Sequence, residues 1–169
     1  MKKIFFGLIF GFLFCLIANG QTVKFSSVYT NLKTQCKDKF KSVGAGQDMP
    51  FVCKGYGGYK LNVDFSAAYE SYSVENAKTT IELFHHFIGR VPAKQVEWRM
   101  ANGKPFAVII RINKYKDESA DAAMNPKKIA EVFIIKGLAG YKHINLAVNA
   151  KSPNAILKAR KLADSNAFK

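Results

Sequence analysis

Strict alternation of apolar and polar residues over positions 59–65 constrains the fold of this chain more than any other feature. Tyrosine, leucine, valine and phenylalanine are separated by lysine, asparagine and aspartate. Because successive side chains of a strand point to opposite faces, this pattern predicts a β-strand with one buried and one solvated face. Gly55, Gly57 and Gly58 precede it. Glycine readily adopts positive φ, so these residues predict a sharp bend or bulge.

A second alternating segment, residues 95–115, predicts a β-hairpin. Apolar residues recur at every second position on both sides of Asn102-Gly103. This dipeptide is typical of a two-residue type I′ turn. Pro105 falls at the start of the second strand, where its missing N–H is tolerated.

Charged residues of this hairpin share the face opposite its tryptophan. Glu97 and Arg99 flank Trp98, and Arg111 comes from the second strand. The alternation places Trp98 in the core and the charged side chains in solvent, where an ion-pair ladder contributes about 0.2–1 kcal/mol per pair. A ligand bound by the carboxylate and guanidinium groups is the alternative.

The amino terminus has the parts of a secretory signal peptide. Met1-Lys2-Lys3 is positive, residues 4–17 are apolar, and Ala18-Asn19-Gly20 supplies small residues, which predicts cleavage near Gly20. The apolar run would reach about 21 Å as a helix, less than the roughly 30 Å hydrocarbon core. Removal of 20 residues from 169 leaves 149, residues 21–169, which we expect to form a single α+β domain without a transmembrane segment, located in the periplasm or secreted.

Export changes the state expected for the cysteines. Cys15 leaves with the signal peptide, and Cys36 and Cys53 remain. In an oxidising compartment the two are expected to form a disulfide, worth on the order of 3 kcal/mol for a loop of this length. Neither has a histidine or second cysteine at metal-ligand spacing, so we expect no metal site there.

Weaker patterns complete the expected fold. We expect a strand or extended arm over 21–32, a loop over 34–47, an antiparallel strand over 67–74, a loop over 116–126 and a hairpin over 129–135 and 144–148. Residues 75–91 fit a short helix or a strand. Ser152-Pro153 predicts the start of a last helix, with serine as its N-cap. The expected class is α+β: a mostly antiparallel, curved sheet of about six strands with one C-terminal helix packed on it.

Several of these segments together carry a family resemblance. The segment 53–59 reads Cys-Lys-Gly-Tyr-Gly-Gly-Tyr, and Glu97-Trp98-Arg99, Pro105-Phe106-Ala107 and Arg111 follow it. The chain resembles a group of uncharacterised exported bacterial proteins with a Cys-x-Gly-x-Gly-Gly-Tyr bend and a Glu-Trp-Arg strand. The resemblance covers most of the mature chain and implies export and a shared fold, but no activity.

The chain is strongly basic. Its net charge of +14 becomes +12 once Lys2 and Lys3 are removed. Such charge attracts lipopolysaccharide, anionic lipids and nucleic acid. However, the basic residues are mostly lysines dispersed along the chain, which is more typical of a solvated surface than of a docking site.

These observations favour a non-enzymatic interaction protein over an enzyme. The sequence has no nucleotide-binding loop, no Gly-x-Ser-x-Gly and no His-Glu-x-x-His. We therefore expect a binding protein for an unknown protein or envelope component, with no cofactor, and two alternatives stay open: a polyanion binder, and an enzyme that uses His85, His86, His143 or Glu97. The candidate binding residues are Tyr56, Tyr59, Glu97, Trp98, Arg99 and Arg111.

Overall fold

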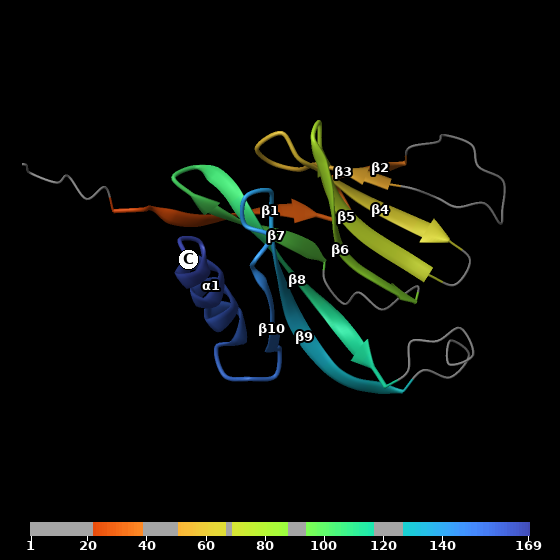
Figure 1. Cartoon of the computed structure of the whole chain (residues 1–169). Coiled ribbons are helices and arrows are strands. Elements are labelled where there is room, and N and C mark those ends of the chain that lie inside the picture. Colours follow the sequence, from red (N-terminus) through yellow and green to blue (C-terminus); the bar gives the residue numbers. More distant parts are fainter. Residues whose placement is uncertain (1–21, 39–50, 67–68, 88–93, 117–126) are drawn as a thin grey trace, which may run out of the picture.

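The computed structural model describes residues 22–38, 51–66, 69–87, 94–116 and 127–169. The predicted signal peptide (1–20), most of the predicted 34–47 loop and nearly all of the predicted 116–126 loop lie outside these residues. Within the described residues, two five-stranded antiparallel sheets and one helix form three layers (Figure 1).

Sheet A combines the first strand of the chain with its last four strands, whereas sheet B is formed by five consecutive strands. Sheet A has the order β1 (Phe25–Asn31), β7 (Gln95–Ala101), β8 (Lys104–Tyr115), β9 (Lys128–Gly137) and β10 (Asn145–Asn149). Sheet B has the order β2 (Cys36–Asp38), β3 (Phe51–Cys53), β4 (Lys60–Ser66), β5 (Tyr69–Asn76) and β6 (Thr79–Phe87). Helix α1 (Ala155–Asn166) follows β10.

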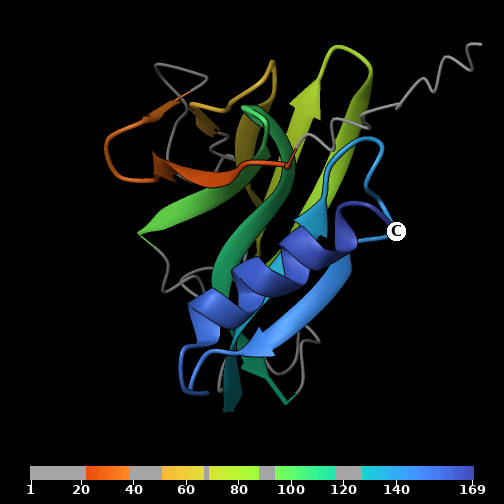
Figure 2. The same ribbon diagram turned by 90° about the vertical axis from the view of Figure 1, so that its left-hand side faces the viewer.

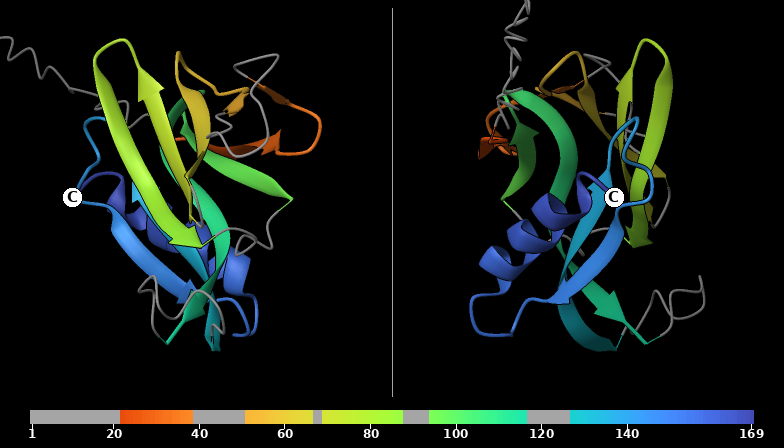
Figure 3. Two further views of the ribbon diagram at one scale, coloured as in Figure 1. Left: turned by 90° about the vertical axis from the view of Figure 1, so that its right-hand side faces the viewer. Right: turned by 60° about the vertical axis from the view of Figure 1, so that its left-hand side comes forward.

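Sheet A is the middle layer and is covered on both faces. One face packs on sheet B, and the buried cluster between them combines Leu61, Val63 and Val74 of sheet B with Val96, Trp98, Met100, Val108 and Ile110 of sheet A. The other face packs on α1 through a second cluster that includes Ile109, Ile135 and three helix alanines. Figure 2 shows α1 lying across sheet A, and the left view of Figure 3, taken from the opposite side, shows sheet B in front of sheet A.

The predicted single sheet of about six curved strands was wrong in strand number and in curvature. After β1 the chain leaves sheet A, builds all of sheet B, and returns to place β7 beside β1. Alternation shows which side chains of a strand share a face, but it does not show which sheet the strand joins. The α+β class, the antiparallel pairing and the C-terminal helix packed on a sheet are confirmed.

An irregularity in strand pairing explains why residues 75–91 fitted both a helix and a strand. They contain the whole of β6, which pairs with β5 with a register shift between Tyr72 and Ser73. As a result, the neighbours Leu83 and Phe84 are both buried. A bulge of this kind breaks the period of two that identifies a strand.

The predicted start of the last helix was also wrong. α1 begins at Ala155, and its N-cap Asn154 has left-handed backbone angles and no capping side-chain bond. The Ser152 carbonyl accepts the Ala155 N–H and closes a turn over Pro153. The serine–proline pair therefore shapes the turn before the helix. Ala155, Ala159 and Ala163 recur every four residues on the buried side, where their small side chains let the helix approach the sheet closely.

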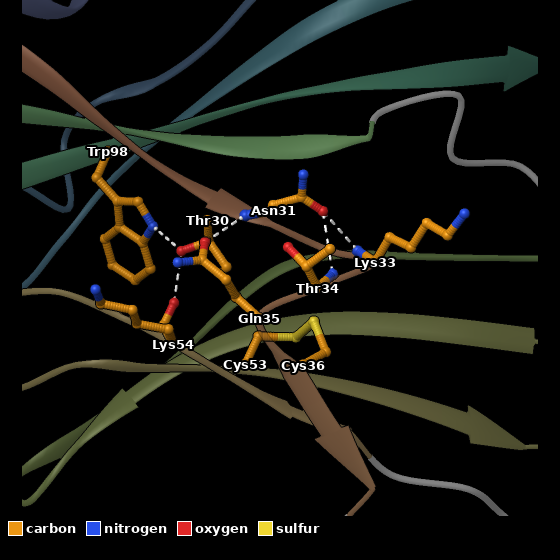
Figure 4. The surroundings of a disulfide bond; sticks show 9 residues. All are labelled: Thr30, Asn31, Lys33, Thr34, Gln35, Cys36, Cys53, Lys54 and Trp98. Atoms are coloured by element: carbon orange, nitrogen blue, oxygen red, sulfur yellow. Dashed lines mark hydrogen bonds between the residues drawn. A yellow bond between two sulfur atoms is a disulfide. The ribbon is translucent and has the colours of Figure 1, made fainter.

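The predicted disulfide joins Cys36 to Cys53, which lie directly opposite each other on β2 and β3 (Figure 4). Next to the disulfide, the hydroxyl of Thr30 donates a hydrogen bond to the backbone carbonyl of Lys54. The same hydroxyl oxygen accepts a hydrogen bond from the indole N–H of Trp98, at 2.9 Å. Thr30 and Trp98 are fully buried. This chain of hydrogen bonds ties β1 and β7 of sheet A to the segment between β3 and β4 of sheet B.

The glycine-rich bend fits tightly between these elements. A Cβ on Gly55 would lie 2.0 Å from the carbonyl oxygen of Tyr59. Gly57 has a φ of 61°, and a Cβ there would lie 2.5 Å from the Pro105 ring at the start of β8. The bend therefore leaves no space for a larger residue at either position.

The turn between β7 and β8 yields the first prediction. Asn102 and Gly103 have φ values of 49° and 77°, as a type I′ turn requires, and nothing lies within 4 Å of a Cβ added at Gly103. Gly103→Val should lower the free energy of unfolding by about 1–2 kcal/mol, because a side chain in the left-handed region strains the backbone. Urea denaturation measures this loss.

Gly103→Asn is the matched control, since asparagine tolerates positive φ better than other side chains. We expect it to lose much less stability than the valine variant. Equal stability of the two variants would contradict the turn assignment.

Candidate functional site

Charged side chains meet in the buried space between sheet A and α1. Glu97 and Arg99 of β7 point toward the helix, and Arg160 and Asp164 of α1 point toward the sheet. Glu97 and Arg99 are only 4% and 5% exposed. The prediction of a solvated ion-pair ladder at these two residues was therefore wrong, because α1 covers the face on which they lie.

Each strand residue pairs with one helix residue of opposite charge. Arg99 Nη2 lies 2.7 Å and 2.6 Å from the two carboxylate oxygens of Asp164, and Arg99 Nε also donates to Oδ1. Arg160 donates from Nε and Nη2 to the two oxygens of Glu97, at 2.7 Å and 3.1 Å. We call these four residues the helix clamp.

The spacing of the clamp follows from the geometry of the two elements. Two residues along a strand advance about 6.7 Å, and four residues along a helix advance about 6 Å. Glu97 and Arg99 are two residues apart, and Arg160 and Asp164 are four apart. Because the two advances nearly match, both ion pairs can form at once.

Strand β1 completes the clamp. Ser27 Oγ donates to Glu97 and accepts a hydrogen bond from Arg99 Nη1 at 2.6 Å. The Tyr29 hydroxyl accepts a hydrogen bond from Arg160 Nη2 at 2.9 Å. The hydrogen bonds to Glu97 raise the pKa of Arg160 above its ordinary value. Both oxygens of Glu97 are occupied, and its carboxylate serves as a fixed partner for Arg160.

A cleft of about 580 Å³ opens beside the clamp, between the first turns of α1 and sheet A. This volume lies within the range of roughly 300–1,000 Å³ that is common for small-molecule sites. The cleft combines an apolar surface with several cations. Its lining residues are Tyr29, Lys94, Gln95, Glu97, Ile109, Arg111, Phe133, Ile156 and Arg160.

Strand register sets the layout of the cleft. One row crosses three strands, because Tyr29 of β1 lies opposite Glu97 of β7, which in turn lies opposite Ile109 of β8. Two residues further along β8, Arg111 lies opposite Phe133 of β9. The helix adds Ile156 and Arg160 from the other side.

The cleft and its rim carry more positive than negative charge. Arg111 is 46% exposed and shares the rim carboxylate of Glu131 with Lys128. Hydrogen bonds from Lys128 and from Arg111 lower the pKa of Glu131, so this group is a carboxylate at neutral pH. Four cations, Lys94, Arg111, Lys128 and Arg160, stand against the two carboxylates Glu97 and Glu131.

The predicted binding residues separate into two groups. Glu97 and Arg111 line the cleft, and Arg99 lies beside it within the clamp. The three aromatic candidates are on the opposite side of sheet A: Tyr56 and Tyr59 pack their rings against buried Trp98, at centroid distances of 5.9 Å and 6.4 Å. These aromatic residues therefore connect the two sheets and do not face the cleft.

Of the nine described residues that line the cleft, sequence reasoning identified only Glu97 and Arg111 and missed seven, among them the polar residues Tyr29, Lys94 and Arg160. Arg160 lies within the predicted last helix and was given no role there. One signal could have identified it: Arg160 and Asp164 are oppositely charged and lie one helical turn apart, which matches Glu97 and Arg99 in reverse charge order.

The histidines considered for an enzymatic site lie apart from the cleft lining. His85 and His86 belong to β6 of sheet B, and the side chain of His86 lies outside the description. His143 precedes β10, and its Nε2 lies 2.8 Å from the Asn166 carbonyl oxygen. Within the described ranges, no group of three histidine, cysteine, aspartate or glutamate residues could hold a metal ion.

Comparison with known proteins gives no relative from which a role could be transferred. No protein family, curated protein or solved structure matches the chain. The resemblance to exported bacterial proteins therefore stays a prediction. In the part of the chain that is described, α1 is too short and too polar to cross a membrane.

The clamp yields the second prediction. Asp164→Ala should destabilise the protein by about 3 kcal/mol, because it leaves the buried Arg99 guanidinium without its main partner. Thermal or urea unfolding measures the loss. Ser165→Ala, at the exposed neighbouring position of the same helix, is the matched control and should change stability little.

A second substitution tests whether the loss comes from the buried charge. Replacing the arginine as well, in Asp164→Ala with Arg99→Met, should recover much of the stability, since an apolar side chain has no charge to bury. If the double variant is less stable than Asp164→Ala alone, the assignment of that loss to Arg99 is incorrect.

Proposed function

We propose that the protein is an exported, non-enzymatic binding protein that takes a small anionic ligand into the cleft between α1 and sheet A. One observation carries the proposal: Lys94 and Arg111 line a cleft with an apolar surface, and Glu97, the only lining carboxylate among the described residues, is already paired with Arg160. Ligand sites are typically apolar clefts with a few charged groups that orient the ligand.

The construction of the cleft supports a binding role over a catalytic one. The described residues that line it include no serine, cysteine or histidine, which are common nucleophiles and proton carriers. Its carboxylate accepts three hydrogen bonds from Ser27 and Arg160. These contacts suit a rigid wall that orients a ligand.

The proposal of export rests on the sequence and on two compatible structural features. A disulfide joins Cys36 to Cys53, and such bonds persist in oxidising compartments such as the periplasm or the extracellular space. The helix of the described chain does not reach membrane-spanning length. Both fit the signal peptide predicted for residues 1–20.

Binding of polyanions through the basic surface is the second candidate function, favoured by the net charge of +12 expected after cleavage at Gly20. Such binding would be shared among many lysines and would weaken steeply with salt. A cleft ligand would instead depend on a few residues, and the two functions are therefore distinguishable.

The third prediction tests the cleft with 1-anilinonaphthalene-8-sulfonate, a fluorescent probe with an apolar ring system and one negative charge. The folded protein should bind it saturably with one site per chain, and fluorescence titration measures the affinity. Changing Lys94 and Arg111 to alanine together should weaken binding at least tenfold, because both cations line the cleft.

The control removes the same charge elsewhere. Lys158 and Lys161 are exposed on α1 and are not among the cleft-lining residues, so the Lys158→Ala, Lys161→Ala variant should retain its affinity. Equal weakening in both double variants, with unchanged circular dichroism, would reject the cleft and favour the dispersed basic surface.

A further inference from the structure

We infer that the cleft selects an organic carboxylate with a compact apolar body, in which the carboxylate meets Arg111 and the body lies on Phe133, Ile109 and Ile156. This inference rests on the proposed function and adds the chemical class of the ligand. The juxtaposition that carries it is fixed by backbone pairing, because Arg111 and Phe133 occupy directly opposite positions on β8 and β9.

The apolar surface of the cleft begins directly beside Arg111. Residues directly opposite each other on antiparallel strands have Cβ atoms about 4.5–5.5 Å apart, so the bases of the Arg111 and Phe133 side chains are neighbours. Ile109 lies two residues before Arg111 on the same face of β8, and both line the cleft. A ligand that contacts the Arg111 guanidinium can therefore also contact the apolar side chains of Phe133 and Ile109.

Part of this apolar wall is exposed to solvent in the cleft. Ile109 is almost fully buried, whereas Phe133 and Ile156 are only half-buried. Removing apolar surface of this kind from water on ligand binding is favourable. An anion without an apolar body, such as acetate or inorganic phosphate, would leave Phe133 and Ile156 in water and lose this contribution.

Arg111 is suited to bind the charged head group of the ligand, which we infer to be a carboxylate. Arginine presents five N–H donors in a planar fork that matches the two oxygens of a carboxylate. Among the described residues, the only hydrogen-bond partner of Arg111 is Glu131, which binds one terminal nitrogen, Nη2. Donors on the remaining nitrogens can therefore address a ligand, and Lys94 lines the same cleft as a second cation.

The carboxylates near the cleft limit the charge that the ligand's head group can carry. Two carboxylates already stand near the cations, Glu97 on Arg160 and Glu131 on Arg111 and Lys128. Like charges placed close together repel, and this repulsion rises with the charge of the ligand. Among the cations that line the cleft, Arg160 is matched by Glu97 and Arg111 by Glu131, which leaves the single charge of Lys94. A singly charged carboxylate balances this charge, whereas a phosphate monoester carries nearly two charges at neutral pH.

The fixed position of the clamp adds selectivity. Glu97 lies in the middle of the row between Tyr29 and Ile109, and its hydrogen bonds with Arg160 of α1 hold both side chains in place. A buried ion pair presents no unpaired charge to a second head group. The cleft is thus suited to a ligand with one charged end.

The test uses isothermal titration calorimetry of the folded protein with four probes: octanoate, 1-octanol, acetate and octyl phosphate. Octanoate should bind with one site per chain. Octanol lacks the charge and acetate lacks the apolar body, so each should bind at least tenfold more weakly than octanoate. Octyl phosphate should bind no more tightly than octanoate.

Two variants assign the contacts. Arg111→Ala should weaken octanoate at least tenfold while leaving octanol unchanged, and Ile156→Ala should weaken octanoate and octanol by the same factor. Because Ile156 is half-buried on the first turn of α1, this change is expected to leave the fold intact, which circular dichroism checks. Lys161→Ala, outside the cleft lining, should change neither probe.

The inference is overturned if octanol or acetate matches octanoate, if octyl phosphate binds tenfold more tightly, or if Arg111→Ala leaves octanoate binding unchanged. The proposed function fails separately. If the anilinonaphthalene probe binds through Lys94 and Arg111 but octanoate does not bind, the anion cleft stands and the carboxylate class is wrong. If neither probe depends on these two cations, both proposals are wrong.

Discussion

The pairing of Glu97 with Arg160 and of Arg99 with Asp164 is the interaction on which the cleft depends. It sets the position of α1 along β7, and that position determines where Ile156 and Arg160 stand above sheet A. Ion pairs at this depth add little net stability compared with apolar packing, but they are specific about partners and register. The small alanines bring the helix close to the sheet, and the charges fix where it lies.

The sequence predicted local structure better than it predicted the site. Alternation identified β4 and the β7–β8 hairpin, and Asn102-Gly103 identified the turn, because each of these signals lies within a few residues. The two cysteines identified the disulfide because its formation depends on the compartment alone. Alternation also placed Glu97 and Arg99 correctly on one face. It could not show that a helix sixty residues later covers that face, and so it assigned two buried charges to solvent.

The same limit explains the aromatic candidates. Trp98 belongs to β7 of sheet A, whereas Tyr56 and Tyr59 lie in the bend between β3 and β4 of sheet B. They meet because Trp98 donates a hydrogen bond to Thr30, and Thr30 donates one to the Lys54 carbonyl next to the bend. The aromatic side chains of these three residues suggested a binding surface, but their contacts hold the two sheets together. The cleft instead uses residues that are unremarkable in sequence, such as Lys94 and Phe133, which become neighbours only through register and helix docking.

The hydrogen bond between Arg160 and Tyr29 joins residues that are 131 positions apart. Closing a loop of that length opposes folding through lost chain entropy, so contacts of this kind form late, after the local hairpins of the two sheets. One wall of the cleft belongs to β1 and the other to α1, with almost the whole described chain between them. Binding of the proposed ligand would therefore report that the entire domain has folded, and a chain arrested with only its hairpins formed would lack the cleft.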